Sequence, residues 1–430
     1  MSSEIIETNE KNLIVSEMAE NLIGSEIIRL AWQINERIAK GQEIYNMTIG
    51  DFDPKIFPIP EELTEEIKKA YSEHHTNYPP ANGSIELRKV ISNFLKTKGG
   101  LDYGIDEIII TSGARPIIYA AFNTIVDNDD VIIFPVPSWN NNHYTHLSRA
   151  RAITIETSPE NNFMPTAADI EPHIGKATLI ALCSPLNPTG TVFTENEVKD
   201  ICDLIVNENN RRGENEKPVY LLFDQIYWLL TLGETKHFNP VLINPEMRNY
   251  TIFVDGLSKA FCGTGVRVGW GYGPKRIIEK MKSITSHMGA WAPKAEQVAI
   301  SRYLGNETIV DSFVDNFKNE ILKRLNSLYK GLMKLKEDGY RVDAIVPQAA
   351  IYMTVKFDLI GSIKEDGSVL ETIEDITEFL ICEAKLALVP FSSFGSSSDS
   401  TWYRISVGTC TLDQIDEIMK NLRYALSKLS

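Results

Sequence analysis

The stretch that decides the fold is TIFVDGLSKAFCGTGVRVGWGYGP, residues 251–274. Its apolar start, Thr251 to Val254, predicts a buried strand, and the small residues that follow predict a turn. The turn presents Lys259, and Arg267 follows eight residues later. A lysine amine forms a Schiff base with an aldehyde, and an arginine binds a phosphate. Unless Lys259 is an ordinary exposed lysine, the stretch predicts a site for a ligand that carries both groups.

The glycines of this stretch do not form a dinucleotide-binding loop. Gly263 and Gly265 begin such a loop, but Gly269 comes one residue late for the G-x-G-x-x-G pattern. No acidic residue follows about 20 residues later in a helix-then-strand context. These observations argue against a nicotinamide-dependent dehydrogenase.

Composition places the chain among soluble globular proteins larger than one ordinary domain. It has 430 residues, 43% hydrophobic and 23% charged, with a formal net charge of −15. The negative charge disfavours nucleic acid and anionic membranes as partners. No apolar run is long enough for a membrane span, and the acidic start MSSEIIETNEKNL lacks a signal core, so we expect a cytoplasmic protein.

The cysteines predict neither a disulfide framework nor a metal site. There are five, an odd number, scattered along the chain without a C-x-x-C pair. Spacing of this kind is typical of small buried side chains.

The order of apolar segments predicts an α/β fold. Short apolar strands separated by helical stretches are typical of a mostly parallel sheet covered by helices. The expected strands are 107–111, 131–134, 152–156, 178–182, 219–223 and 251–254.

A different pattern begins after about residue 290. A long helical region, 294–337, leads into expected strands at 341–346, 351–357 and 403–407, with helices at 371–384 and 411–428. We interpret this part as a smaller α+β domain, which the N-terminal residues join. The predicted division is 1–54 for an N-terminal arm and part of the small domain, 55–315 for the large domain, and 316–430 for the small C-terminal domain.

Polar and small residues follow the expected strands, where ligands of open α/β sheets bind. Ser112, Gly113 and Ala114 follow strand 107–111 and precede a helix, as in an anion site at a helix N-terminus or in an ordinary turn. Trp139 follows the next strand and could stack on a planar ring or pack in the core. Asn187, in the turn Asn-Pro-Thr-Gly, could donate to a phenolate oxygen.

Asp224 and Tyr227 complete this set. A carboxylate at the end of an apolar strand is costly unless it is paired, and a protonated pyridine nitrogen is a suitable partner. Tyr227, three residues later, could bond an oxygen on the same ring and lower the pKa of an imine. With Lys259 and Arg267, these residues predict a site for pyridoxal phosphate.

The motifs resemble, in order and spacing, those of the pyridoxal-phosphate-dependent aminotransferases of class I/II, the aspartate aminotransferase superfamily. The resemblance extends from about residue 25 to 425. It rests on Ile49-Gly50, Tyr78 in NYPPANG, Ser112-Gly113-Ala114, Pro137-Ser138-Trp139, Asn187-Pro188-Thr189-Gly190, Asp224 with Tyr227, Ser258-Lys259, Arg267, and Arg404 in YRIS.

The resemblance implies a role for each residue. Lys259 would form the internal aldimine and move the proton, Asp224 would pair with the pyridine nitrogen, and Tyr227 and Asn187 would bond the ring oxygen. Trp139 would stack on the ring. The phosphate would be held by Ser112, Gly113, Ala114, Ser258 and Arg267, and by Tyr78 of the other subunit of a homodimer. Arg404 would clamp the substrate α-carboxylate, with Gly50 closing over it.

The chain departs from the family pattern at two positions near the phosphate. Gly256 stands where the family usually has a serine that contacts phosphate, and Ala114 offers only its backbone. We therefore expect that one side-chain contact to the phosphate is missing or replaced.

The substrate is less closely defined. Arg115 matches a lysine that binds the distal carboxylate in one bacterial subgroup, which favours aspartate with 2-oxoglutarate, although Arg115 could also face solvent. Aromatic, alanine and branched-chain specificities stay open. A lyase or synthase on the same fold, such as a C–S lyase or an aminocyclopropane-carboxylate synthase, would use the same cofactor residues. A transcriptional regulator is disfavoured because no basic DNA-binding module is recognisable.

Overall fold

The computed structural model of the chain describes residues 14–430. The first 13 residues of the expected N-terminal arm lie outside the described residues. The acidic start, on which the expectation of a cytoplasmic location partly rested, lies there too.

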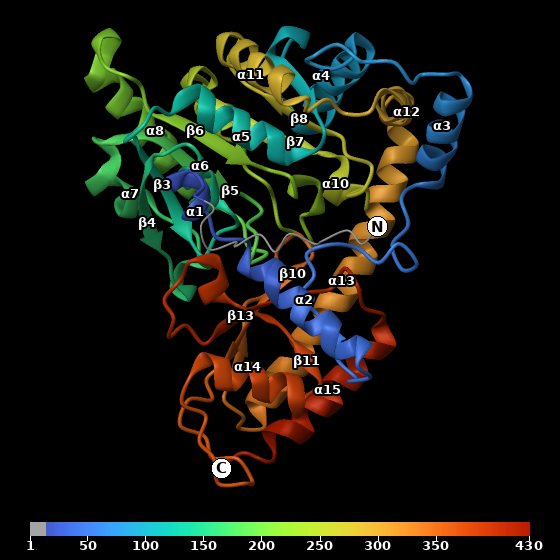
Figure 1. Cartoon of the computed structure of the whole chain (residues 1–430), viewed down its shortest axis with the longest axis vertical. Coiled ribbons are helices and arrows are strands. Elements are labelled where there is room, and N and C mark those ends of the chain that lie inside the picture. Colours follow the sequence, from blue (N-terminus) through green and yellow to red (C-terminus); the bar gives the residue numbers. More distant parts are fainter. Residues whose placement is uncertain (1–13) are drawn as a thin grey trace, which may run out of the picture.

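A seven-stranded sheet forms the centre of the larger part of the molecule (Figure 1). Six strands are parallel, and β8 alone runs antiparallel, between β2 and β7. The prediction of a mostly parallel sheet is therefore confirmed. The order across the sheet is β2 (Ile108–Thr111), β8 (Gly269–Tyr272), β7 (Thr251–Gly256), β6 (Tyr220–Asp224), β5 (Ala177–Cys183), β3 (Val131–Val136) and β4 (Arg151–Glu156).

Strand β8 was not predicted, because its glycines favour a turn. Gly269 and Gly271 are nevertheless buried strand residues. A Cβ atom at Gly269 would lie 2.5 Å from the carbonyl carbon of Gly113, so only glycine lets the strand pass this close to the neighbouring turn.

Helices cover both faces of this sheet, which explains why its inner strands are largely apolar. In β2, β3, β5, β6 and β7, alternate residues contribute to two separate hydrophobic clusters. One face packs against α5 (Ala114–Ile125), α6 (Asn141–Leu147) and α11 (Lys275–Met288). The other packs against α4 (Ile85–Gly99), α7 (Ala167–Ile174), α8 (Glu195–Arg212) and α12 (Lys294–Leu304), with α3 (Glu61–Ser72) and α9 (Pro240–Ile243) outside them.

The smaller part is built around a four-stranded sheet at the other end of the molecule. Its order is β12 (Val389–Pro390), β13 (Trp402–Ser406), β10 (Tyr352–Phe357) and β9 (Val342–Ala344), all antiparallel. Helices α14 (Ile373–Cys382) and α15 (Leu412–Leu426) belong to it. Four helices, α7, α8, α14 and α15, are each preceded by a threonine whose hydroxyl accepts the N–H of the residue three positions later. The side chain of that later residue accepts the threonine N–H in return, and this capping box fixes where each helix starts.

The N-terminal segment joins the smaller part, as predicted. Strand β1 (Tyr45–Asn46) pairs in parallel with β11 (Leu386–Ala387). Helix α2 (Glu26–Ala39) lies beside it, and Arg37 makes a bidentate ion pair with Glu378 of α14. A short helix, α1 (Glu17–Glu20), precedes α2. The domain boundaries proposed from the sequence stay predictions.

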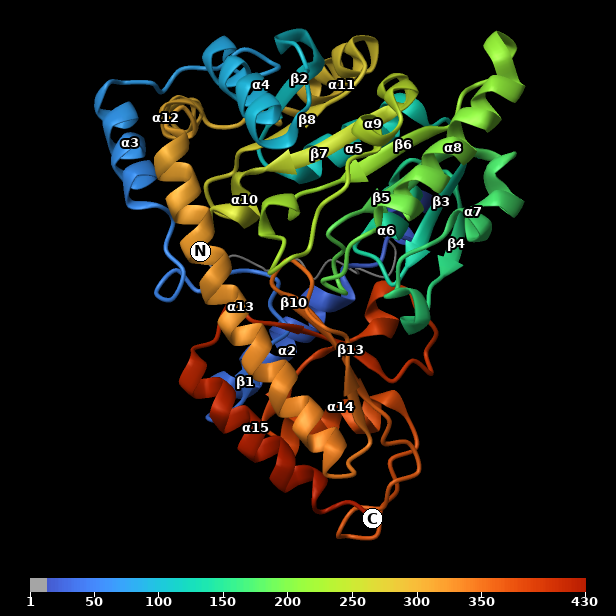
Figure 2. The same ribbon diagram turned by 180° about the vertical axis from the view of Figure 1, so that it is seen from behind.

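The helical region predicted over 294–337 is two helices. Helix α12 ends at Leu304, and α13 (Glu307–Glu337) starts after Asn306, whose side chain accepts the N–H of Ile309. Figure 2 shows α13 running from the larger part down to the smaller part. The backbone break at Gly305 separates a helix that covers the large sheet from one that connects both parts.

Among residues 14–430, no helix combines the length and the apolar character that crossing a membrane requires.

Candidate active site

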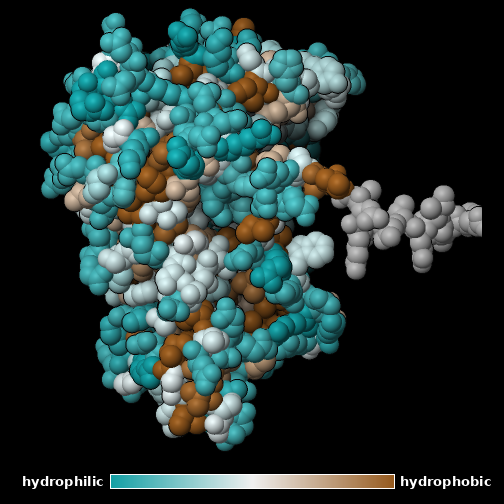
Figure 3. All heavy atoms as spheres, turned by 60° about the vertical axis from the view of Figure 1, so that its left-hand side comes forward, coloured by the Kyte–Doolittle hydropathy of each residue, from teal (hydrophilic) through white to brown (hydrophobic). Residues whose placement is uncertain are grey.

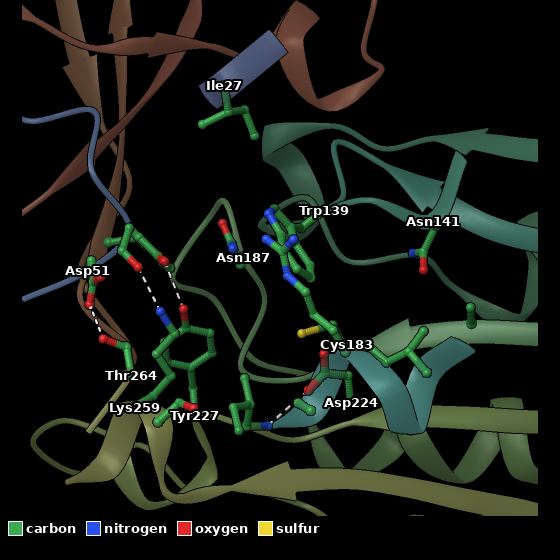
Figure 4. A pocket seen from close by; sticks show the side chains of 18 of the residues that line it. Ile27, Asp51, Trp139, Asn141, Cys183, Asn187, Asp224, Tyr227, Lys259 and Thr264 are labelled. Atoms are coloured by element: carbon green, nitrogen blue, oxygen red, sulfur yellow. Dashed lines mark hydrogen bonds between the residues drawn. The ribbon is translucent and has the colours of Figure 1, made fainter. Parts of the chain in front are cut away.

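A cavity of about 390 Å³ lies between the ends of β5, β6 and β7 and strand β10 (Figure 4). It brings together most of the predicted site residues. Its lining includes Gly50, Ala114, Arg115, Trp139, Asn187, Asp224, Tyr227, Ser258, Lys259, Arg267 and Arg404. Ser112, Gly113 and Tyr78 are not part of this lining.

Lys259 lies in α10 (Leu257–Ala260), a single helical turn directly after β7. Its Nζ donates a 2.6 Å hydrogen bond to the carbonyl oxygen of Gly50 and lies 5.8 Å from the centre of the Tyr227 ring. The amine therefore points into the cavity (Figure 4) and is not an exposed surface lysine.

Asp224 ends strand β6, next to β7 in the sheet. Its Oδ1 accepts the N–H of Ile226 at 3.0 Å. The carboxyl opens to the cavity but is shielded from bulk water; burial raises its pKa to about 6, while Lys259 acts in the opposite direction. A cationic ring nitrogen would supply the partner that this carboxyl lacks in the described chain.

A second buried carboxyl, Asp255, lies behind Asp224 and was not identified from the sequence. The indole N–H groups of Trp228 and Trp270 donate to its Oδ2 at 2.8 and 3.2 Å, and the N–H of Gly256 donates to Oδ1. Burial, with a contribution from Asp224, raises its pKa to about 8. An aspartate inside an apolar strand gives no sequence signal for these indole partners.

Arg267 occupies the end of the cavity where a phosphate is expected. Its Nη1 donates to the carbonyl of Thr264 at 2.6 Å, and its Nη2 donates to that of Ser112 at 2.8 Å. Gly113 has a φ of +93°, and a Cβ there would lie 2.3 Å from Nη2 of Arg267. The predicted residues Ser112 and Gly113 thus lie behind the guanidinium, while Ala114 and Ser258 reach the cavity.

The structure gives a reason for the departure at Gly256. A Cβ at this position would lie 2.9 Å from the Cα of Gly269 in β8 and 3.2 Å from the carbonyl oxygen of Val268. A serine would therefore have to push two paired strands apart.

Arg404, from β13, is a buried cation at the opposite end of the cavity, with only 2% of its surface exposed. Its Nη1 donates to Oδ1 of Asn187 at 3.0 Å and its Nη2 donates to the carbonyl of Thr48. Its Nε has no partner, and no carboxylate of residues 14–430 forms an ion pair with it. Burial lowers the pKa of this guanidinium, and a bound carboxylate would compensate its charge.

Arg115 lies at the start of α5, exposed at the cavity wall. Its guanidinium carbon lies 4.7 Å from the centre of the Trp139 ring, a cation–π contact that aims it across the cavity. The side chain therefore faces both solvent and the site.

Tyr78 does not reach the cavity of its own chain. It is 82% exposed, and its ring meets the edge of Trp291 at 5.3 Å. Its assignment to the phosphate of a second subunit stays a prediction.

The lining also includes residues that were not identified from the sequence, among them Asp51, Thr264 and Tyr352. The Thr264 hydroxyl donates to Oδ1 of Asp51 at 2.7 Å, which ties the loop after Lys259 to the N-terminal segment. Tyr352 lies on a strand that was predicted, but only the packing of the two sheets shows that its side chain enters the site.

The sequence matches the family of class I and II aminotransferases over residues 42–422. The aspartate aminotransferase of Geobacillus stearothermophilus is 28% identical over 407 residues, which cover 94% of this chain and 96% of that protein. A probable aspartate/prephenate aminotransferase of Rhizobium leguminosarum is also 28% identical, over 93% of this chain and 95% of that protein.

Solved structures show the same fold. The aspartate aminotransferase of Rhizobium meliloti superimposes with a TM-score of 0.87 at 24% identity, covering 97% of this chain and 100% of that one. The aspartate aminotransferase of Thermus thermophilus with maleate gives a TM-score of 0.85 at 24% identity, covering 96% and 100%. The chain belongs to the class I and II aminotransferases, which depend on pyridoxal phosphate.

Proposed function

We propose that this enzyme transfers an amino group between L-aspartate and 2-oxoglutarate, and that Lys259 is the residue that bonds to the cofactor. One observation carries the proposal. A single cavity contains the Lys259 amine, the Asp224 carboxyl and the guanidinium groups of Arg267, Arg404 and Arg115.

The residues around the cavity fit pyridoxal phosphate. Arg267 and the start of α5 form a cationic end for the phosphate, and Asp224 supplies the carboxyl for a protonated ring nitrogen. Trp139 supplies an aromatic face, and Asn187 and Tyr227 supply polar groups for the ring oxygen. When bound, the cofactor supplies an aldehyde that reacts with amines and a ring that accepts electrons.

Lys259 would be the proton carrier. Its Nζ would take the proton from the Cα atom of the amino acid, and the carbonyl of Gly50, 2.6 Å away, would orient the amine. Asp224 would keep a negative charge if it faced a cationic ring nitrogen; its pKa of about 6 belongs to the chain without this partner.

The two remaining arginines support a dicarboxylic substrate. Arg404 offers its fork to the α-carboxylate, which every amino acid carries. Arg115 would bind the second carboxylate, which only acidic amino acids carry. The names of the relatives, aspartate aminotransferases, agree with this assignment.

A homodimer is the assembly that the surface supports. The face in Figure 3 is mainly hydrophilic with separate hydrophobic patches. Large apolar side chains are exposed near the start of the described chain: Ile14, Val15, Ile23, Ile28 and Trp32. A second copy would cover them and would bring Tyr78 to the partner's phosphate site.

We further propose a cytoplasmic location. We also propose that the protein has no nucleic-acid or membrane partner, since its net charge is −15.

Half-reactions with single amino acids test this function. The protein loaded with pyridoxal phosphate is mixed with one amino acid at a time, without a 2-oxo acid, while the visible spectrum and the products are followed. We expect aspartate and glutamate each to release one equivalent of 2-oxo acid per site and no ammonia. Continuous release of ammonia would identify a lyase instead. Conversion by alanine or aromatic amino acids alone would refute the dicarboxylate assignment.

A further inference from the structure

Tyr352 connects the two sheets inside the site. It belongs to β10 of the smaller sheet, yet its hydroxyl lies 2.7 Å from the hydroxyl of Tyr227, which follows β6 of the larger sheet. The two rings meet edge to face, with centroids 5.6 Å apart. Tyr352 has no exposed surface, so this pair is shielded from bulk water.

The Tyr352 ring is held in one position. The guanidinium carbon of Arg404 lies 4.7 Å from the ring centre. A Cβ at Gly50 would lie 2.7 Å from the Tyr352 hydroxyl. The backbone at Gly50, whose carbonyl accepts the hydrogen bond of Lys259, therefore packs directly against this hydroxyl. The segment around Tyr352 is bonded to the 187–190 turn: the hydroxyl of Thr354 donates to the carbonyl of Thr189, and the N–H of Ala349 donates to the carbonyl of Gly190.

The number of protons available decides which hydroxyl donates in the Tyr227–Tyr352 hydrogen bond. Each tyrosine hydroxyl has one proton to donate and can also accept. If Tyr227 donates its proton to the oxygen of the cofactor ring, as the proposed function requires, Tyr352 must be the donor in the Tyr227–Tyr352 pair. Tyr352 itself has no other hydroxyl partner among the described residues.

We propose that Tyr352 is a positioning residue that donates its hydroxyl proton to Tyr227 and so directs the Tyr227 proton to the cofactor ring oxygen. The inference rests on the proposed function. Successive hydrogen bonds polarise one another, so a Tyr227 hydroxyl that accepts from Tyr352 is a stronger donor. Through its ring, Tyr352 also supports Arg404, the residue assigned to the substrate carboxylate.

The surroundings of Tyr227 keep it a neutral donor. Burial is the main cause that raises its pKa well above the usual range, and the charge of Arg404 acts in the opposite direction. Lys259, 5.8 Å from the ring centre, also faces Tyr227. The thiol of Cys183 is itself neutral, because burial raises its pKa as well.

The test is the pH midpoint of the visible absorption change in the enzyme loaded with pyridoxal phosphate. A hydrogen bond to the ring oxygen disperses its negative charge and favours loss of the nearby proton, so losing that bond raises the midpoint. We expect Tyr227→Phe to raise it by about one unit or more, and Tyr352→Phe by roughly half a unit. In the Tyr227→Phe background, Tyr352→Phe should add no further shift.

Tyr403→Phe is the matched control. Tyr403 is a buried tyrosine on the neighbouring strand β13, and its hydroxyl donates to the carbonyl of Ile373 in α14. Its removal should leave the midpoint unchanged. The role of Tyr352 would be overturned if Tyr352→Phe had the wild-type midpoint, or if Tyr352→Phe shifted the midpoint equally in the wild-type and Tyr227→Phe backgrounds. Either result would leave the proposed function standing. A wild-type protein without a cofactor band would instead overturn the proposed function on which it rests.

Discussion

The proposed phosphate end and the proposed carboxylate end of the cavity are built differently. At the phosphate end, Arg267 is fixed by two backbone carbonyls and packs against Gly113 with no room for a Cβ atom. At the carboxylate end, the buried Arg404 donates to Asn187 and Thr48, but its Nε has no partner within the described part of the chain. The hydrogen bonds of Arg267 are therefore complete within the described chain, whereas a substrate carboxylate would complete those of Arg404.

The largest effect should come from Lys259, which lies between the two ends. Under the proposed function, Lys259→Ala removes both the amine that bonds the cofactor and the proton carrier, so kcat should fall by about a thousandfold or more. Steady-state rates with aspartate and 2-oxoglutarate measure this. The control is Lys275→Ala, which removes an exposed lysine paired with Asp106. Turnover at the wild-type rate in Lys259→Ala would remove Lys259 from the mechanism.

Arg404→Lys tests the carboxylate end. The charge is kept but the planar fork is lost, so kcat/KM should fall by roughly a hundredfold for every amino acid. The affinity for pyridoxal phosphate should stay close to wild type, because Arg404 lies away from the phosphate end. An equal loss of cofactor affinity would show that the two ends are not independent.

Gly113→Ala tests the phosphate end. The new methyl group would lie 2.3 Å from Nη2 of Arg267 at a φ of +93°. We expect the dissociation constant for pyridoxal phosphate to rise by about tenfold or more, since the arginine must move. Gly289→Ala is the control, because Gly289 also has a positive φ, +66°, but has open space around it. Similar affinities in the two variants would mean that the close packing around Arg267 is unimportant.

Arg115→Met distinguishes the contribution of Arg115 to substrate binding from that of Arg404. Methionine keeps the apolar contact with Trp139 but loses the charge. The kcat/KM for aspartate and glutamate should fall by roughly tenfold, while that for alanine should change little. Equal losses for alanine and aspartate would exclude Arg115 from substrate selection.

The smallest effect is expected behind the cofactor end, at Asp255. Its pKa is about 8 in the folded protein against 3.8 for an ordinary aspartate. The folded state thus keeps a proton that the unfolded chain has already released, so the wild-type protein loses stability as the pH rises from near 3.8 toward 8. Unfolding temperatures of the cofactor-free protein should depend less on pH in Asp255→Asn. An unchanged pH dependence would mean that Asp255 is ionised when folded.

The sequence was most informative about the cofactor end. Asp224 and Lys259 directly follow apolar strands, and adjacent parallel strands must end at one edge of the sheet, so their proximity could be inferred. The existence of strand β8 could not be inferred, because Gly269 and Gly271 suggest a turn. Only the folded structure shows that Gly269 is needed for the close approach of Gly113.

The carboxylate end was harder to predict. Arg404 was identified only by family resemblance, and the contacts of Tyr352 depend on how two sheets far apart in sequence pack together. Local patterns carry no information about that packing. The indole partners of Asp255 were missed for the same reason, since Trp228 and Trp270 meet only in the folded core.

The most direct test of the central claim is to locate the covalent bond between protein and cofactor. The enzyme loaded with pyridoxal phosphate is reduced with borohydride, digested, and its peptides are analysed by mass spectrometry. We predict one modified peptide, with the added mass on Lys259. A modification on another lysine, or none at all in a protein that binds the cofactor, would contradict the assignment of Lys259 and of the site around it.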